Sequence, residues 1–182
     1  MHDPRNDLQV GGEYTTTPRL DSTTEQIRRN FNIAFEGNFC KFILPKPARQ
    51  KVPTNETPTA VAYQATIPSL LSQNDPSSTW TICTGSQGDL AMCPVPAMPQ
   101  GALFSMSTAA ARENESTNVR FNEIYLCFRV EVDELAVEHG VTTASDFGKV
   151  FELILDSPEV RSSRVRVEDV GDLGVLKWKR RF

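Results

Sequence analysis

The sequence predicts α-helices in four segments of the chain, and in the first two of them apolar residues recur at helical spacing. In the first, Ile27 and Phe31 share one face, and a run of polar N-cap candidates precedes them. In the second, we expect Pro68 and the polar stretch after it to end the helix. The predicted helices cover residues 22–39, 60–67, 100–112 and 144–155.

Runs of β-branched and aromatic residues predict strands between these helices. Residues 79–84, Thr-Trp-Thr-Ile-Cys-Thr, suit a buried strand, and residues 118–132 begin with a strongly strand-like sequence. Shorter runs predict a strand at residues 8–10, before a Gly-Gly turn, and a last strand at residues 164–167. Helices that alternate with strands in this way are typical of an α/β protein with a mainly parallel sheet.

The composition is that of one globular domain. The chain has 182 residues, of which 39% are hydrophobic and 23% charged, and its net charge is −4. This charge gives no general attraction to nucleic acid or to anionic lipid, and we interpret the basic tail Lys-Trp-Lys-Arg-Arg-Phe as a solvated terminus. The first residues lack the features of a secretory signal, and no apolar run approaches the roughly 18 residues that span a bilayer. We therefore expect a cytoplasmic protein without a membrane or nucleic-acid partner.

Cysteine and histidine are too few and too scattered to predict a metal site. No two cysteines have the Cys-x-x-Cys spacing, and each stands in or beside an apolar stretch, so we expect reduced thiols in the core. The two histidines stand far apart, and His139 precedes a glycine that is typical of a helix end. Neither a zinc site nor a His-based triad is expected. The residues concerned are Cys40, Cys83, Cys93, Cys127, His2 and His139.

Four stretches, in this order, resemble the short-chain dehydrogenase/reductase family from its fourth strand to its C-terminus. They are Val-Gly-Gly-Glu-Tyr at residues 10–14, the helix at residues 23–39, the segments 65–71 and 79–88, and residues 100–126. The resemblance implies a single domain over residues 1–182 with a partial Rossmann-like, doubly wound sheet. About four mainly parallel strands with flanking helices are expected, and the N-terminal βαβ half of the family's fold is missing. It also implies descent from an oxidoreductase that uses NADP or NAD.

The residues that the family needs for its cofactor and its chemistry are absent. No Gly-x-x-x-Gly-x-Gly spacing, which lets the backbone approach a pyrophosphate, occurs among the ten glycines. The family also uses a Tyr with a Lys four residues later, and this Lys lowers the pKa of the phenol. No tyrosine here has such a lysine, and Pro96 and Gln100 stand at the two positions. We therefore predict no bound cofactor and little or no activity for this chain.

Two further positions of the family's site are also replaced. The helix Asn that helps to organise a proton-relay water aligns with Ala34, three residues before Gly37. The Pro-Gly pair beside the nicotinamide aligns with Leu126 and Cys127. These differences extend the predicted loss of function beyond the Tyr and Lys.

Candidate site residues remain at the end of the strand at residues 79–84. The family's catalytic serine aligns with Thr84, Gly85 or Ser86, so Thr84 and Ser86 are the catalytic candidates, although an isolated hydroxyl has no base. Ser86 with Asp89 is either a remnant active-site corner or, as we favour, a turn stabilised by its polar side chains.

Other charged and sulfur-containing residues have two interpretations each. Glu123 and Arg129 either face a ligand crevice or, as we favour, lie at strand ends or pair with each other or with solvent. Three methionines either line a pliable pocket or, as we favour, fill gaps in the core. They are Met92, Met98 and Met106.

Two alternative functions and two structural expectations follow. The first alternative to an inactive oxidoreductase is a cofactor-free isomerase, cyclase or lyase that acts on a small hydrophobic substrate. The second is a non-catalytic partner in a homo- or heterodimer. The dimer would form through residues 22–39 and 100–112, as the resemblance implies. The Pro-rich residues 41–59 are foreign to the family and are either a surface insertion loop or a segment wrongly retained when the gene was read. We expect four parallel strands, with the edge at residues 10–14 covered by the N-terminal residues, by this loop or by a second subunit.

Overall fold

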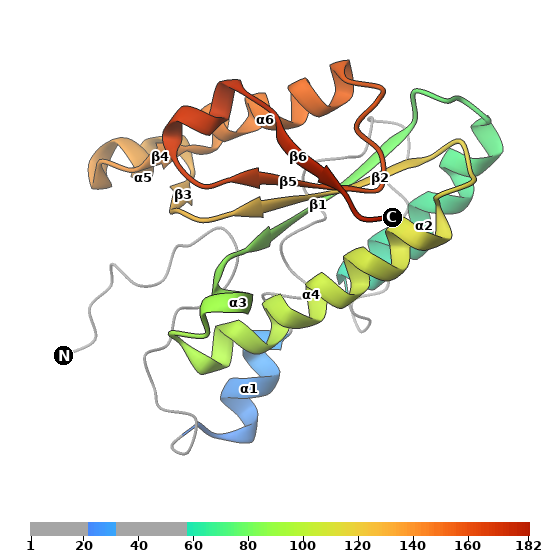
Figure 1. The fold of residues 1–182 in the computed structure, drawn as a ribbon. Helices are drawn as coiled ribbons and strands as arrows, with labels where there is room; N and C mark the ends of the chain where they lie inside the picture. The colour runs from blue at the N-terminus through green and yellow to red at the C-terminus, as the bar shows by residue number, and fades with distance from the viewer. Residues whose placement is uncertain (1–21, 32–57) are drawn as a thin grey trace.

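A computed structural model describes residues 22–31 and 58–182 of the chain, and it shows an α/β fold (Figure 1). The helices are α1 (Thr24–Phe31), α2 (Pro58–Gln73), α3 (Gln87–Leu90), α4 (Pro94–Glu113), α5 (Asp133–His139), α6 (Ala144–Asp156) and the 3-10 helix η4 (Val170–Gly174). The strands are β1 (Thr79–Gly85), β2 (Arg120–Leu126), β3 (Val130–Glu131), β4 (Thr142–Thr143), β5 (Ser163–Val167) and β6 (Lys177–Arg180).

The main sheet has four strands in the order β1-β2-β5-β6. β1, β2 and β5 are parallel, as predicted, so their carboxyl ends meet at one edge. β6 pairs antiparallel with β5, so the described sheet is not parallel throughout. Four residues of the basic tail form this strand, which the sequence did not predict, and their side chains are exposed, as expected for a solvated terminus. β3 and β4 make a separate parallel pair.

Helices cover both faces of the sheet. Figure 1 shows α6 and α5 on one side and α4 and α2 on the other. β2, in the middle, is buried at every residue except Leu126, as a parallel strand covered on both faces should be. No described helix is both long and apolar enough to cross a membrane.

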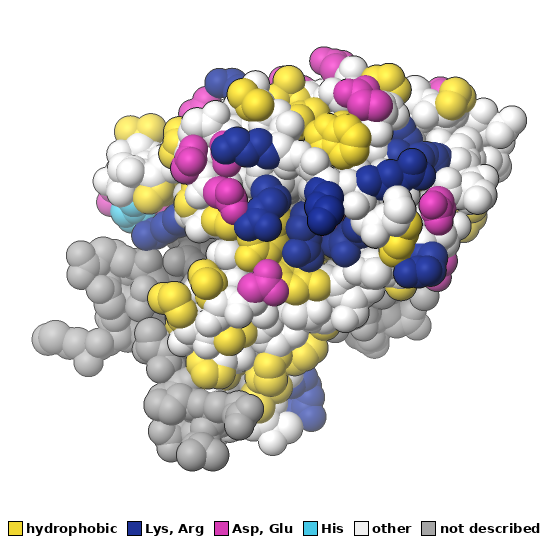
Figure 2. All heavy atoms as spheres, in the orientation of Figure 1, with side chains coloured by type: hydrophobic (Ala, Val, Ile, Leu, Met, Phe, Trp, Pro, Cys, Tyr) yellow, Lys and Arg dark blue, Asp and Glu magenta, His cyan; other side chains and the backbone are white. Residues whose placement is uncertain are grey.

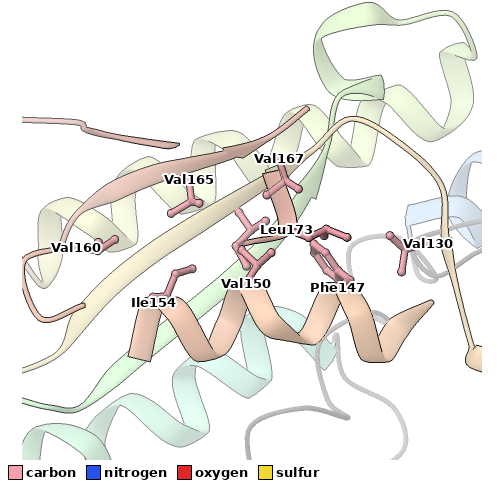
Figure 3. Packing of buried hydrophobic residues seen from close by; sticks show 9 residues of the cluster. Val130, Phe147, Val150, Ile154, Val160, Val165, Val167 and Leu173 are labelled. Atoms are coloured by element: carbon pink, nitrogen blue, oxygen red, sulfur yellow. The ribbon is translucent and has the colours of Figure 1, made fainter. Parts of the chain in front are cut away.

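The core on the α6 side consists of aliphatic side chains with one phenylalanine (Figure 3). Val150 and Ile154 of α6 point toward Val165 of β5. Burying one such side chain contributes about 1.5–3 kcal/mol. The helix itself begins at the Thr143 cap, whose Oγ1 accepts a hydrogen bond from the Asp146 N–H at 2.9 Å. The predicted helix at residues 144–155 is confirmed.

The core on the α4 side is aromatic. Trp80 of β1 stacks on Phe121 of β2, with ring centroids 5.3 Å apart. Tyr63 of α2 meets both rings edge-on, at 5.3 Å from Trp80 and 5.9 Å from Phe121. These contacts hold α2 against the amino ends of the strands.

Two helices contain prolines that the sequence analysis placed outside them. α2 does not end at Pro68 but runs to Gln73, and Leu70 beyond the proline packs on the aromatic core. α4 begins at Pro94, ahead of the predicted start at residue 100. The N–H groups of a first helical turn have no intrahelical partner, so Pro94 and Pro96 lose nothing there, and only Pro99 removes a hydrogen bond. Burial of apolar side chains offsets that loss.

Several predictions concern residues outside the described part of the chain. These are the strand at residues 8–10 with the edge at residues 10–14, the helix beyond residue 31, and the insertion loop up to residue 57. At its other end the loop is shorter than predicted, because residues 58–59 belong to α2. His2, Ala34, Gly37 and Cys40 also lie outside the described residues.

Candidate functional site

Thr84 and Ser86 lie where β1 ends, at the edge of the sheet at which open α/β folds bind ligands. Thr84 is buried, and its Oγ1 donates a hydrogen bond to Glu123 Oε1 at 2.7 Å. Ser86 opens α3, and its N–H donates to the Leu126 carbonyl at 2.9 Å. The two hydroxyls are therefore placed differently, because Thr84 belongs to a buried network and Ser86 lies in the half-buried turn that follows β1. We call residues 84–89 the β1 corner.

Side chains of α4 fill the β1 corner from the other side. Gln100 is buried, and its Oε1 accepts a hydrogen bond from the Gly85 N–H at 2.7 Å. Gly88 is so close to the Phe104 ring that an added Cβ would collide with it. Pro96, one turn before Gln100, is buried as well. α4 thus packs directly on Gly85 and Gly88 of the corner.

Tyr125 and Cys127, at the end of β2, have neutral side chains at ordinary pH. Burial and a hydrogen bond to Asp89 raise the pKa of Tyr125 to about 12. Burial, together with the charge of Glu168, raises the pKa of the Cys127 thiol. A phenol or thiol that holds its proton is a weak base and a weak nucleophile. The carboxylate of Asp89 therefore accepts the hydrogen bond of the Tyr125 hydroxyl. The sequence had indicated only a polar turn for Ser86 and Asp89.

Glu123 forms a buried ionic cluster in the middle of β2, which sequence reasoning missed. Arg164 of β5 donates from Nε to Glu123 Oε2 at 2.8 Å and from Nη2 to Oε1 at 3.1 Å. Arg181, just after β6, donates to the same carboxylate and also to Thr108 Oγ1 at 2.7 Å. Our placement of Glu123 at a strand end was wrong. Its only sequence signal is the Ser-Arg-Val-Arg-Val pattern of β5, whose register places Arg164 beside Glu123.

A known protein matches almost the whole chain. The short-chain dehydrogenase/reductase iacG of Pestalotiopsis fici is 42% identical to it over 175 residues. The chain is therefore homologous to this short-chain dehydrogenase/reductase over nearly all of its own length. The match covers 93% of this chain and 62% of that protein, so the chain spans about three fifths of the length of its curated relative. No family model matches the chain, and no solved structure does.

Within this family the helix equivalent to α4 would carry the Tyr and Lys of the Tyr-x-x-x-Lys motif. Here the two positions that our alignment assigns to them are Pro96 and Gln100, both buried against the sheet. Pro96 has no group that titrates, and the Gln100 amide is used by the Gly85 N–H. At these two aligned positions the helix therefore carries neither a phenol nor an ammonium group.

An apolar hollow lies beside the β1 corner. It has a volume of about 480 Å³ and is lined by residues of α3, α4 and the turn between them. Of the three methionines, Met98 lines this hollow, Met92 is exposed, and Met106 packs against the aromatic core. The lining residues are Gly88, Ala91, Pro94, Ala97, Met98 and Gly101.

Arg129 belongs to a second cluster, built on β3 and α5, and it does not pair with Glu123. Glu131 is buried and contacts Arg129, and the His139 Nδ1 lies 2.6 Å from its Oε2. Gly140, with φ of 64°, ends α5 directly after His139, as predicted. The described residues contain no cluster of three or more potential metal ligands. Cys83, Cys93 and Cys127 are free thiols.

Acidification is expected to remove the stabilisation that Glu131 contributes. Burial would raise the pKa of Glu131, but hydrogen bonds from His139 and Arg129 bring it below the ordinary value of 4.5. A carboxyl group with such a lowered pKa stabilises the fold above its unfolded-state pKa, and this stabilisation is lost as the pH falls through the folded-state value. Urea unfolding of the chain and of Glu131→Gln, at a series of pH values, measures the difference.

The advantage of the original chain over Glu131→Gln should be full at neutral pH and shrink below a pH of about 4.5. Glu134→Gln is the matched control, because Glu134 is exposed on α5. A difference between chain and variant that stays constant across the pH range would contradict the prediction.

Proposed function

We propose that this chain descends from an NAD(P)-dependent oxidoreductase and has little or no hydride-transfer activity. One contact carries the proposal: Gln100, at the family's lysine position, binds the Gly85 N–H at the end of β1 with its amide oxygen. A glutamine amide has no positive charge with which to lower the pKa of a phenol or to hold a nicotinamide ribose. Pro96, at the tyrosine position, has no proton to give.

The described tyrosines do not replace the missing one. The pKa of Tyr125 is raised to about 12, and its ring contacts Arg164 and Arg166, whose guanidinium carbons are 5.0 and 5.4 Å from the ring centroid. Burial and hydrogen bonding also raise the pKa of Tyr63 to about 12. Tyr63 binds Glu113 and Asn114 near the far end of α4. A general base works best with a pKa near the working pH, and neither phenol meets this condition.

An assay of turnover tests the proposal. The purified chain is mixed with NADPH or NADH and a panel of aldehydes and ketones, and the absorbance of the reduced nicotinamide is followed. We expect a rate equal to that of the mixture without protein. An intact family member with the Tyr-x-x-x-Lys pair serves as the positive control. A rate that depends on the concentration of the chain and disappears on heat denaturation would contradict the proposal.

The apolar hollow favours a second candidate function, a cofactor-free isomerase, cyclase or lyase that acts on a small hydrophobic substrate. A ligand-sized apolar space beside the carboxyl ends of the strands is what such a function needs. The homo- or heterodimer through α1 and α4 stays a prediction. α1 packs on α4 within the chain.

Filling the hollow is expected to abolish binding of a small apolar ligand. Gly101 lines the hollow, and a Cβ added there meets no atom within 4 Å, so Gly101→Phe introduces a large apolar side chain at the wall of the hollow. Gly148 on α6 is equally open, so Gly148→Phe is the matched control. An apolar fluorescent dye such as anilinonaphthalene sulfonate is titrated into all three proteins. Binding that is lost in Gly101→Phe alone supports the second function, and equal binding in the three proteins contradicts it.

A further inference from the structure

β6 leaves one edge of the main sheet open among the described strands. In an antiparallel pair, successive residues point their N–H and C=O alternately at the neighbouring strand and away from it. The Arg181 N–H donates to the Ser162 carbonyl at 2.9 Å, so Lys179 and Lys177 also point toward β5. The backbone groups of Trp178 and Arg180 therefore point outward, where an added strand would find them.

The side chains of β6 are exposed and differ between its two faces. Lys177 and Lys179 lie on the α4 face, in register with Arg166 and Arg164 of β5. Trp178 lies on the opposite face and is 39% exposed. An extended segment with acidic and apolar residues in alternation would match both faces at once.

This part of the surface has an excess of positive charge. Figure 2 shows Lys and Arg side chains gathered where Figure 1 places β5 and β6. The single negative charge of Glu123 is shared by two guanidiniums, those of Arg164 and Arg181. Glu123 therefore balances only one of these two positive charges. Lys177 contacts Asp172, whereas Lys179 makes no ion pair with any described residue. Lys179 is thus the cation most available to a partner.

A second copy of β6 does not suit this edge. Antiparallel pairing of two such strands through Trp178 and Arg180 would place Lys179 opposite the same lysine of the other copy. Like charges directly opposite each other destabilise a strand pair. The occupant must bring negative charge.

We propose that the free edge of β6 binds an acidic, extended segment of a partner protein as an added β-strand. Main-chain hydrogen bonds to Trp178 and Arg180 supply the attachment, and carboxylates facing Lys177 and Lys179 supply the specificity. This inference goes beyond the proposed function, since it uses neither the β1 corner nor the hollow.

The probe is a peptide in which glutamate alternates with valine, and the control peptide has lysine in place of each glutamate. Amide hydrogen exchange of the full chain, measured by NMR, locates the binding. We expect the glutamate peptide to protect the Trp178 and Arg180 amides and to blue-shift the fluorescence of Trp178. Raising the salt toward 1 M, at which the Debye length is about 3 Å, should weaken this binding. The lysine peptide should neither protect these amides nor shift the fluorescence.

Two variants separate charge from backbone pairing. Lys179→Glu should lower the affinity for the glutamate peptide about tenfold. Lys149→Glu, a charge reversal at an exposed site on α6, should leave this affinity unchanged. Arg180→Pro removes an outward N–H but keeps the bonds to β5, and it should abolish protection at Trp178. Binding without protection of these amides, equal binding of both peptides, or binding only of a single-stranded oligonucleotide or an anionic vesicle would overturn the proposal.

Discussion

Replacing Glu123 by alanine is expected to lower the free energy of unfolding by about 3–5 kcal/mol, the usual cost of removing one partner from a buried ion pair. Glu123 is fully buried and holds Arg164 and Arg181. Without it, two partly buried guanidiniums lose the carboxylate that they share. Urea unfolding followed by circular dichroism measures the change.

Glu168→Ala is the matched control for this prediction. Glu168 also pairs with an arginine, Arg166, but that pair is about half exposed. An exposed pair contributes only about 0–1 kcal/mol, so the control should remain close to the original chain. Equal losses in the two variants would contradict a structural role for the buried cluster.

Replacing Phe121 by alanine is expected to cost about 3–5 kcal/mol, through lost burial and through the cavity that remains. Phe121 is 1% exposed and contacts the rings of both Trp80 and Tyr63. The same unfolding experiment measures the loss. Phe182→Ala is the control, since Phe182 is 40% exposed and makes a contact only at the surface, with Arg112. A loss of less than about 1 kcal/mol for Phe121→Ala would show that the aromatic core does not hold the sheet.

Local patterns were sufficient to predict the buried strands and the amphipathic helix α6. β1 and β5 lie within a residue of their predicted bounds, because a run of β-branched residues between polar turns has few alternatives. β6 was missed because Lys-Trp-Lys-Arg has no apolar alternation. Its place depends instead on Arg181, which reaches the Glu123 carboxylate of a distant strand. Sequence patterns do not encode such long-range pairs.

In the candidate site, too, the features set by local sequence could be predicted and those set by long-range contacts could not. The end of β1 could be located, so Thr84 and Ser86 were correctly placed near the carboxyl edge of the sheet, and their catalytic role stays a prediction. The contact between Gln100 and Gly85 could not be foreseen, because it depends on how α4 crosses that strand. α4 itself starts six residues before its predicted start, and its prolines concealed this in the sequence. Helix-start prolines resemble loop prolines until the fold is known.

Titration of the chain with NADPH, followed by nicotinamide fluorescence and by calorimetry, tests the central claim most directly. The claim is that the position equivalent to the family's lysine is now a structural glutamine, closed against the end of β1. We predict no saturable change in fluorescence and no heat of binding at concentrations that saturate an intact family member. Saturable binding with a micromolar dissociation constant would contradict the account.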